Sequence, residues 1–154
     1  MPYVASWSFP PAKGGVNIVN AGIDAFFRTN GLGQGRSLRF QACIEGVCNY
    51  CAGNIRERGG AEEIYLRLYW EDRSLRGLVY HYGPGGEWDH ALDARHRGRV
   101  RRTSFDALGL FIAQELAADL VFRSQYDVVA GRTVREYEIF YDLDGEPGVE
   151  AGAA

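Results

Sequence analysis

Two polar side chains four residues apart form the part of this sequence with the clearest chemical potential. Glu45 and Asn49 lie in a stretch whose pattern predicts one long helix, so both should project from the same face. A carboxylate can act as a base or orient a water molecule, and an amide oxygen is an acceptable ligand for a hard cation. The spacing therefore predicts a phosphoryl-transfer pair, although the same pair is also common on solvated helix faces.

A cluster of arginines forms a second candidate site. Its members are Arg95, Arg97, Arg99, Arg101 and Arg102. Lys13 is the only lysine of the chain, so almost all positive charge is carried by guanidinium groups, which form paired hydrogen bonds to carboxylate or phosphate. The cluster predicts either a surface for an anionic ligand or acidic partner, or a solvated loop whose charges have no specific role.

The length, net charge and hydropathy of the chain limit the class of protein to which it can belong. Its 154 residues are enough for one domain with a single core, and its net charge of −3 argues against a general nucleic-acid-binding protein. No apolar run reaches the roughly 18 residues that span a bilayer, and the N-terminus has no targeting pattern. We expect a cytoplasmic protein that binds neither nucleic acid nor membrane, with one domain over residues 1–142 and a disordered tail over residues 143–154.

Three cysteines, Cys43, Cys48 and Cys51, fall on the same predicted helix. Their odd number and their shared helix fit reduced thiols better than a disulfide framework. Cys48 and Cys51 also form a C-x-x-C motif, but a redox pair of this type begins a helix after a strand, and no nearby residue completes a zinc site. We therefore expect all three to be small core residues.

The periodicity of apolar residues predicts three helices and five strands. The helices cover residues 15–28, 37–58 and 105–118. The strands cover residues 3–9, 63–71, 74–82, 120–125 and 132–142. A segment of about eighteen residues after Gly86 has no periodicity, and loops of this length are usually functional or mobile. The order predicts an α+β fold: a two-layer α/β sandwich in which three helices cover one face of a mixed, mainly antiparallel sheet.

This order of elements resembles the Bergerat fold of histidine-kinase-type and gyrase-type ATPases. The resemblance rests on Glu45-x-x-x-Asn49 in the second helix, a glycine loop after the third strand, and a Gly-Leu pair in the helix that follows the long loop. The short chain, the opening strand and the lack of dimerisation helices look most like the anti-sigma-factor serine kinases. The resemblance covers residues 4–142.

By this resemblance, Glu45 would be the general base or water-orienting carboxylate, and Asn49 would be a ligand of Mg²⁺. Gly109 would bring the amides of a helix N-terminus to the phosphates of ATP. Arg99 and Arg101 would lie in the lid that folds over the triphosphate. These residues, together with the glycine loop, would converge on a single cleft.

The nucleotide motifs depart from the family pattern at two places. The family motif Asp-x-Gly-x-Gly, which holds adenine, reads His81-Tyr-Gly83-Pro-Gly85 here, and a histidine accepts a hydrogen bond only when neutral. In the later glycine motif, Ala107 replaces a glycine and Asp106 adds a negative charge to the helix start. His81, Gly83 and Gly85 remain candidates for cofactor binding, but both departures favour a weakened nucleotide site.

Three functions remain open. The first is an anti-sigma-factor-like bacterial regulator of transcription, a partner-binding switch with a partly degraded ATP site. Its partner would be a sigma factor or an anti-anti-sigma antagonist, and this interpretation allows a homodimer. The second is an active Mg·ATP-dependent serine kinase that phosphorylates such an antagonist. The third is an interaction domain that binds no nucleotide.

Overall fold

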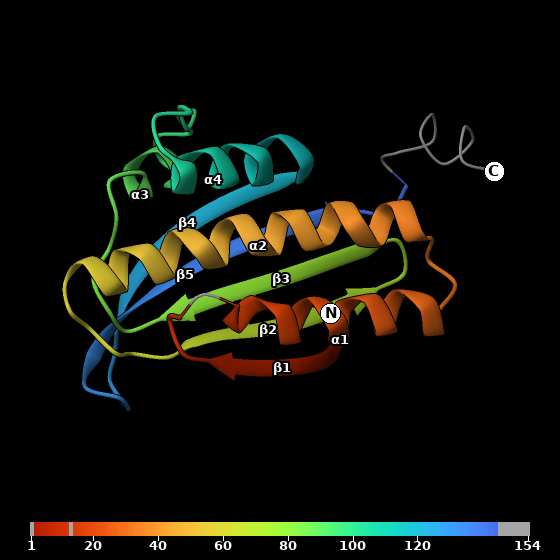
Figure 1. The fold of residues 1–154 in the computed structure, drawn as a ribbon, viewed down its shortest axis with the longest axis horizontal. Coiled ribbons are helices and arrows are strands. Elements are labelled where there is room, and N and C mark those ends of the chain that lie inside the picture. Colours follow the sequence, from red (N-terminus) through yellow and green to blue (C-terminus); the bar gives the residue numbers. More distant parts are fainter. Residues whose placement is uncertain (1, 13, 145–154) are drawn as a thin grey trace.

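The protein is an α+β domain, and its computed structural model describes residues 2–12 and 14–144 (Figure 1). The described chain forms five strands and four helices. In chain order they are β1 (Tyr3–Phe9), α1 (Gly15–Thr29), α2 (Gln34–Glu57), β2 (Ile64–Glu71), β3 (Ser74–His81), α3 (Asp89–Leu92), α4 (Phe105–Leu116), β4 (Asp119–Asp127) and β5 (Arg132–Asp142). The expected order of elements is confirmed.

The five strands form one antiparallel sheet in the order β1-β2-β3-β5-β4. The expectation of a mixed sheet is wrong, because β2–β3 and β4–β5 are hairpins and β5 returns between β3 and β4. Within the described residues, the parallel pairing is limited to one isolated bridge between Asp93 and Phe122. This bridge attaches the segment after α3 to the outer strand.

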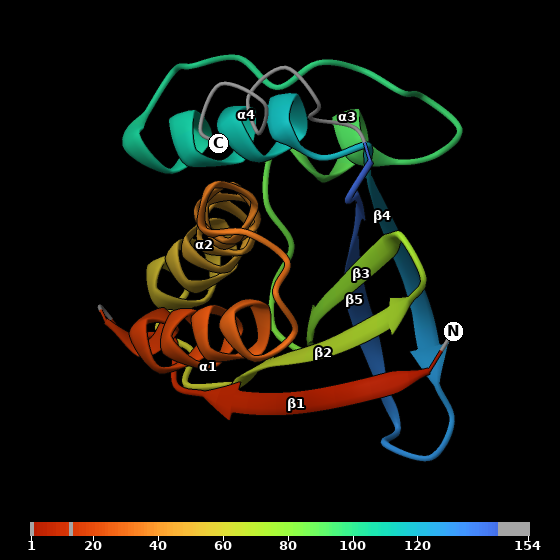
Figure 2. The same cartoon turned by 90° about the vertical axis from the view of Figure 1, so that its right-hand side faces the viewer.

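The helices form a second layer on one face of the sheet (Figures 1 and 2). The first helix buries an apolar stripe with helical spacing, made of Val16, Val19, Ile23 and Phe27. α2 packs on α1 and on the sheet, and α4 packs mainly against α2. The structure has one more helix than the three predicted. The additional helix is α3, a single turn within the segment predicted to be a loop.

The ends of the elements follow local sequence signals. Ser104 caps α4, since its hydroxyl accepts a hydrogen bond from the Ala107 amide at 3.1 Å. At the other end of the domain, the Leu143 amide donates to the carbonyl of Arg73 at 2.8 Å, and Leu143 is buried. The domain therefore continues past residue 142, and the rest of the predicted tail, residues 145–154, lies outside the described residues.

All three cysteines are buried thiols outside any disulfide, as predicted. Burial raises the pKa of the Cys48 and Cys51 thiols, which keeps both protonated. Among the helices that the structure describes, none combines the length and apolar character needed to cross a membrane.

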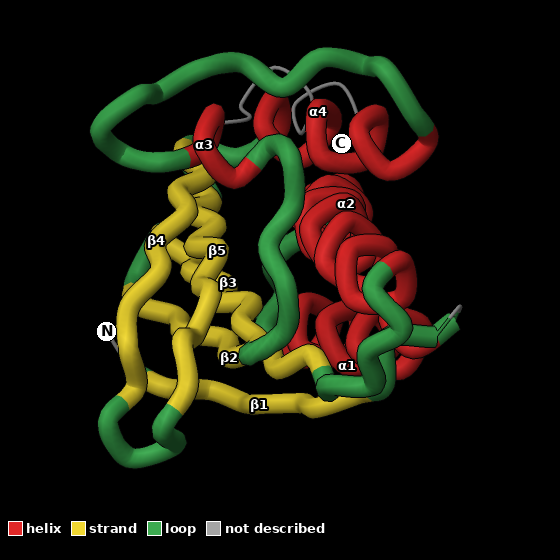
Figure 3. Tube along the Cα trace, turned by 90° about the vertical axis from the view of Figure 1, so that its left-hand side faces the viewer, coloured by secondary structure: helices red, strands yellow, loops and turns green. Residues whose placement is uncertain are grey.

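The position of the site follows from one hairpin. β2 begins shortly after α2 ends, and β3 runs antiparallel to β2, so the end of β3 lies near the C-terminal end of α2. Figure 3 shows the connection after β3 passing between the sheet and α2 on its way to α3. The glycine turn at residues 83–86 is therefore held beside the last turns of α2.

Candidate functional site

The predicted site residues do not share one cleft, and four of them line two separate hollows. We call the first the interhelical groove. It is lined by Ala42, Glu45, Gly46, Asn49, Phe105, Asp106, Leu108, Gly109 and Ile112. We call the second the turn hollow. It is lined by Tyr50, Asn54, Glu57, Arg58, Gly85, Gly86, Glu87, Trp88, Ser104, Asp106 and Ala107. The start of α4 reaches both hollows, but Asn49 and the glycine turn do not share one.

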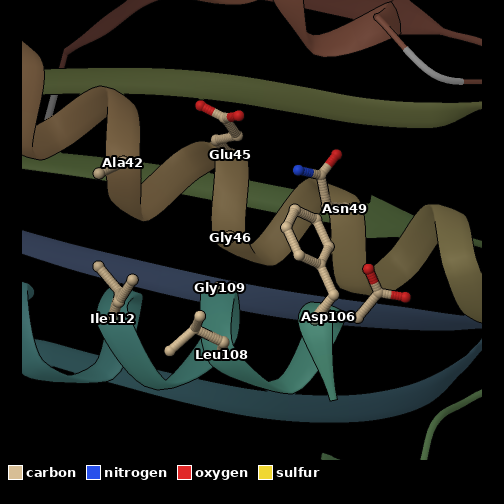
Figure 4. A pocket seen from close by; sticks show the side chains of 9 residues that line it. Ala42, Glu45, Gly46, Asn49, Asp106, Leu108, Gly109 and Ile112 are labelled. Atoms are coloured by element: carbon tan, nitrogen blue, oxygen red, sulfur yellow. The ribbon is translucent and has the colours of Figure 1, made fainter. Parts of the chain in front are cut away.

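The interhelical groove lies between α2 and α4 (Figure 4). Glu45 and Asn49 share one face of α2, as their spacing predicts, with Glu45 exposed and Asn49 half-buried. The groove has a volume of about 210 Å³, below the roughly 300 Å³ of ordinary small-molecule pockets. Across the described residues, no cluster of three or more His, Cys, Asp or Glu side chains forms a metal site. The groove at Glu45 and Asn49 is therefore small for a nucleotide.

Gly109 lies one turn inside α4 and contacts α2 instead of facing a ligand. A Cβ atom on Gly109 would lie 3.3 Å from the Cα of Gly46, and a Cβ atom on Gly46 would overlap the carbonyl oxygen of Gly109. The two glycines let the helix backbones approach closely. Gly109 is therefore a packing residue in this structure, and it lies apart from the first-turn amides that would face phosphates.

Tyr50 and Asn54, rather than Glu45 and Asn49, meet the glycine turn. An α-helix rises about 1.5 Å and turns about 100° per residue, so five residues shift a side chain by about 7.5 Å and onto another face. Tyr50 and Asn54 also lie closer to the C-terminal end of α2, where the hairpin places the turn. This pair has the same i, i+4 spacing, with a phenol in place of the carboxylate.

Asp89 connects the glycine turn to α2 and β5. Its carboxylate accepts hydrogen bonds from the Tyr50 hydroxyl at 2.9 Å, the Tyr137 hydroxyl at 2.7 Å and the Gly86 amide at 3.0 Å. The Tyr50 hydroxyl in turn accepts from the Trp88 amide at 2.9 Å. Burial raises the pKa of Asp89, and burial together with the Asp89 carboxylate raises the pKa of Tyr50. Tyr50 is therefore a neutral hydrogen-bond donor, and its hydroxyl is not available as a base near neutral pH.

His81 is fully buried beneath this network. Its ring stacks on the Tyr137 ring, with centroids 6.1 Å apart and an angle of 18° between the planes. Nδ1 accepts the Gly83 amide at 3.0 Å, which assigns the ring proton to Nε2, and Nε2 has no acceptor among the described residues. Burial, together with the positive charge of Arg135, lowers the pKa of His81 to about 4. His81 is therefore neutral and enclosed by protein.

Three of the backbone amides that would bind an anion already donate inside the protein. The amides of Gly83 and Gly86 donate to His81 and Asp89, and the Ala107 amide donates to Ser104. The carbonyl of Gly83 accepts from Arg135 at 2.6 Å. Phosphate binding at a glycine turn or a helix start depends on free amides of this kind. These internal bonds therefore compete with any phosphate.

The arginine cluster is largely neutralised by nearby carboxylates. Arg97 pairs with Asp119 at 2.6 Å, and Arg95 with Asp93 at 3.1 Å. Arg99 pairs with Glu115. The guanidinium of Arg101 lies 5.9 Å from the centre of the Trp88 ring. Arg99 thus serves the packing of this loop on α4, and Arg101 lies near the rim of the turn hollow.

The charge of the turn hollow does not favour a triphosphate. The hollow has a volume of about 320 Å³ and is lined by three carboxylates and one guanidinium. The carboxylates belong to Glu57, Glu87 and Asp106, and the guanidinium to Arg58. Like charges this close raise the free energy of binding an anion.

Tyr50, Asn54 and Asp89 are the residues that sequence reasoning missed. The predicted hairpin of residues 63–82 returns the chain to the end of the second helix, and residues 50 and 54 lie in the last third of that helix. This signal could have placed both residues near the glycine turn. No sequence signal pointed to Asp89, since it belongs to a segment without periodicity.

No protein-family model matches the chain, and a search of curated proteins finds no match. The site is therefore interpreted from its geometry.

Proposed function

We propose that this protein is an anti-sigma-factor-like regulatory domain, a partner-binding switch on a histidine-kinase-type ATPase (Bergerat) fold whose nucleotide site is occupied by its own side chains. The observation that carries this proposal is the Tyr50–Asp89–Tyr137 network above the buried His81. In an ATPase of this fold, the space between the glycine turn, α2 and the sheet would hold the nucleotide. In this proposal, the side chains of the network take the place of the nucleotide.

Three further features support loss of nucleotide binding. The amides of Gly83 and Gly86 donate within the protein, carboxylates outnumber basic groups in the turn hollow, and the Tyr50 phenol stands four residues before Asn54. A neutral phenol with a raised pKa is a poor general base near neutral pH. The proposal includes a cytoplasmic location and a protein partner, either a sigma factor or its antagonist, with a homodimer as one form.

An active Mg·ATP-dependent serine kinase is the second candidate. It is favoured by the turn hollow itself, because Asn54, Gly85 and the first turn of α4 line one space. In that case Asn54 would be the Mg²⁺ ligand. Nucleotide binding would first have to displace the internal bonds of Gly86 and Asp89.

Titration calorimetry with Mg·ATP separates the two candidates. The regulatory proposal predicts no saturable heat, whereas a dissociation constant below about 100 μM would support the kinase. Asn54→Ala and Asn49→Ala form a matched pair of variants for a positive result. Loss of the Mg²⁺-dependent affinity in Asn54→Ala alone would place the nucleotide in the turn hollow, and loss in Asn49→Ala alone would restore the site predicted from the sequence.

A further inference from the structure

An apolar strip on α4 has no partner in the described structure. The exposed fractions of Phe105, Leu108 and Ile112 are 82%, 38% and 38%. Their i, i+3, i+7 spacing places them on one flank of the helix, where they line the interhelical groove (Figure 4). A contiguous exposed strip of this kind is typical of a binding surface.

The opposite wall of the groove is formed by small residues of α2. Ala42 and Gly46 line it, and the Gly46–Gly109 contact forms its floor. Gly46 is buried against α4, whereas Ala42 is half-buried and presents only a methyl group, so an added helix can approach α2 closely at Ala42. The groove has the form in which an amphipathic helix inserts apolar anchors spaced by three or four residues.

The charge of the groove specifies the partner further. Its two ionisable lining residues are Glu45 on α2 and Asp106 on α4, and both are acidic. Neither carboxylate forms an ion pair within the part of the chain that is described. Complementary charge at the rim of an apolar interface orients a partner and excludes others.

We propose that the interhelical groove binds an amphipathic helix of a partner protein. The apolar residues of that helix contact Phe105, Leu108 and Ile112, and its Lys or Arg residues contact Glu45 and Asp106. This inference rests on the proposed regulatory function and identifies its docking surface. A second copy of the chain pairing groove to groove would bring the same carboxylates together, so the charge favours a different partner.

A display library of helical peptides tests this surface. Peptides of about 16 residues would carry fixed apolar positions at helical spacing and randomised flanking positions. Selection on the nucleotide-free protein should enrich Lys and Arg at the flanks. Fluorescence anisotropy should then show about tenfold weaker binding to Ile112→Lys and to Glu45→Arg. Ile18→Lys is the matched control, because Ile18 is 71% exposed on α1, and its affinity should stay within about twofold.

Charge reversal makes the test specific. Selection on Glu45→Arg should shift the flanks toward Asp and Glu. The proposal is overturned if no helix is enriched, if the selected flanks carry no basic preference, or if Glu45→Arg binds the basic peptides as well as the wild type does. It is also overturned if sedimentation shows a wild-type dimer that Ile112→Lys dissociates. Because the selection uses no nucleotide, its result is independent of the Mg·ATP titration, which tests the proposed loss of the nucleotide site.

Discussion

Asp89 decides how the residues around the glycine turn behave. Its carboxylate accepts hydrogen bonds from two tyrosine hydroxyls and one backbone amide, so these three donors beside the turn are already paired. Buried polar groups that are satisfied in this way stabilise one arrangement, and a ligand that breaks them must replace each bond. A ligand at the glycine turn would therefore have to replace the bonds of Asp89.

The buried state of His81 predicts a pH dependence of stability. Its pKa is about 4 in the folded protein and about 6.5 in an unfolded chain, so between these values the unfolded state binds a proton that the folded state does not. The stability present above pH 6.5 is lost as the pH falls toward 4. At pH 5 the loss is on the order of 2 kcal/mol.

Urea denaturation at pH 7.5 and pH 5 measures this loss in the wild type and in His81→Gln. The wild type should lose more stability on acidification than the variant, by about the amount above. His90→Gln replaces an exposed histidine and should behave like the wild type. An equal loss in wild type and His81→Gln would show that His81 is protonated in the folded protein.

At the scale of elements, the close crossing of α2 and α4 depends on Gly46, where it meets Gly109. A methyl group on Gly46 would overlap the backbone of α4, so Gly46→Ala should separate the helices and cost about 1 to 3 kcal/mol. Gly109→Ala meets its nearest atom at 3.3 Å and gains helix propensity, so its effect should lie within about 1 kcal/mol of zero. Thermal unfolding of both variants checks this asymmetry. Equal destabilisation would mean that the helices cross elsewhere.

The elements themselves could largely be predicted from the sequence. Apolar periodicity placed α1, α2 and α4 within a few residues of their ends, and alternation placed β1 and β5 correctly. Periodicity could not show which polar pair of α2 faces the glycine turn. Both Glu45/Asn49 and Tyr50/Asn54 have i, i+4 spacing on the same helix. Only the hairpin geometry, which sets which end of α2 meets the turn, distinguishes the two pairs.

At the scale of the whole molecule, local sequence patterns could not predict which distant strands pair in the sheet. Periodicity showed that β4 and β5 are neighbours in sequence, but the insertion of β5 between β3 and β4 depends on contacts between distant segments. The Asp93–Phe122 bridge and the packing of Leu143 depend on such contacts as well. The insertion of β5 places Tyr137 opposite Val79 of β3, where its hydroxyl reaches Asp89, so this contact became visible only in three dimensions.

The central claim is that side chains of the protein occupy the nucleotide space at the glycine turn. An amide NMR titration with a non-hydrolysable Mg·ATP analogue tests this claim at the residues concerned. The predicted result is that the amide signals of Gly83, Gly85 and Gly86 do not move at analogue concentrations up to about 1 mM. Saturable shifts that concentrate at these three glycines and at Asn54 would contradict it.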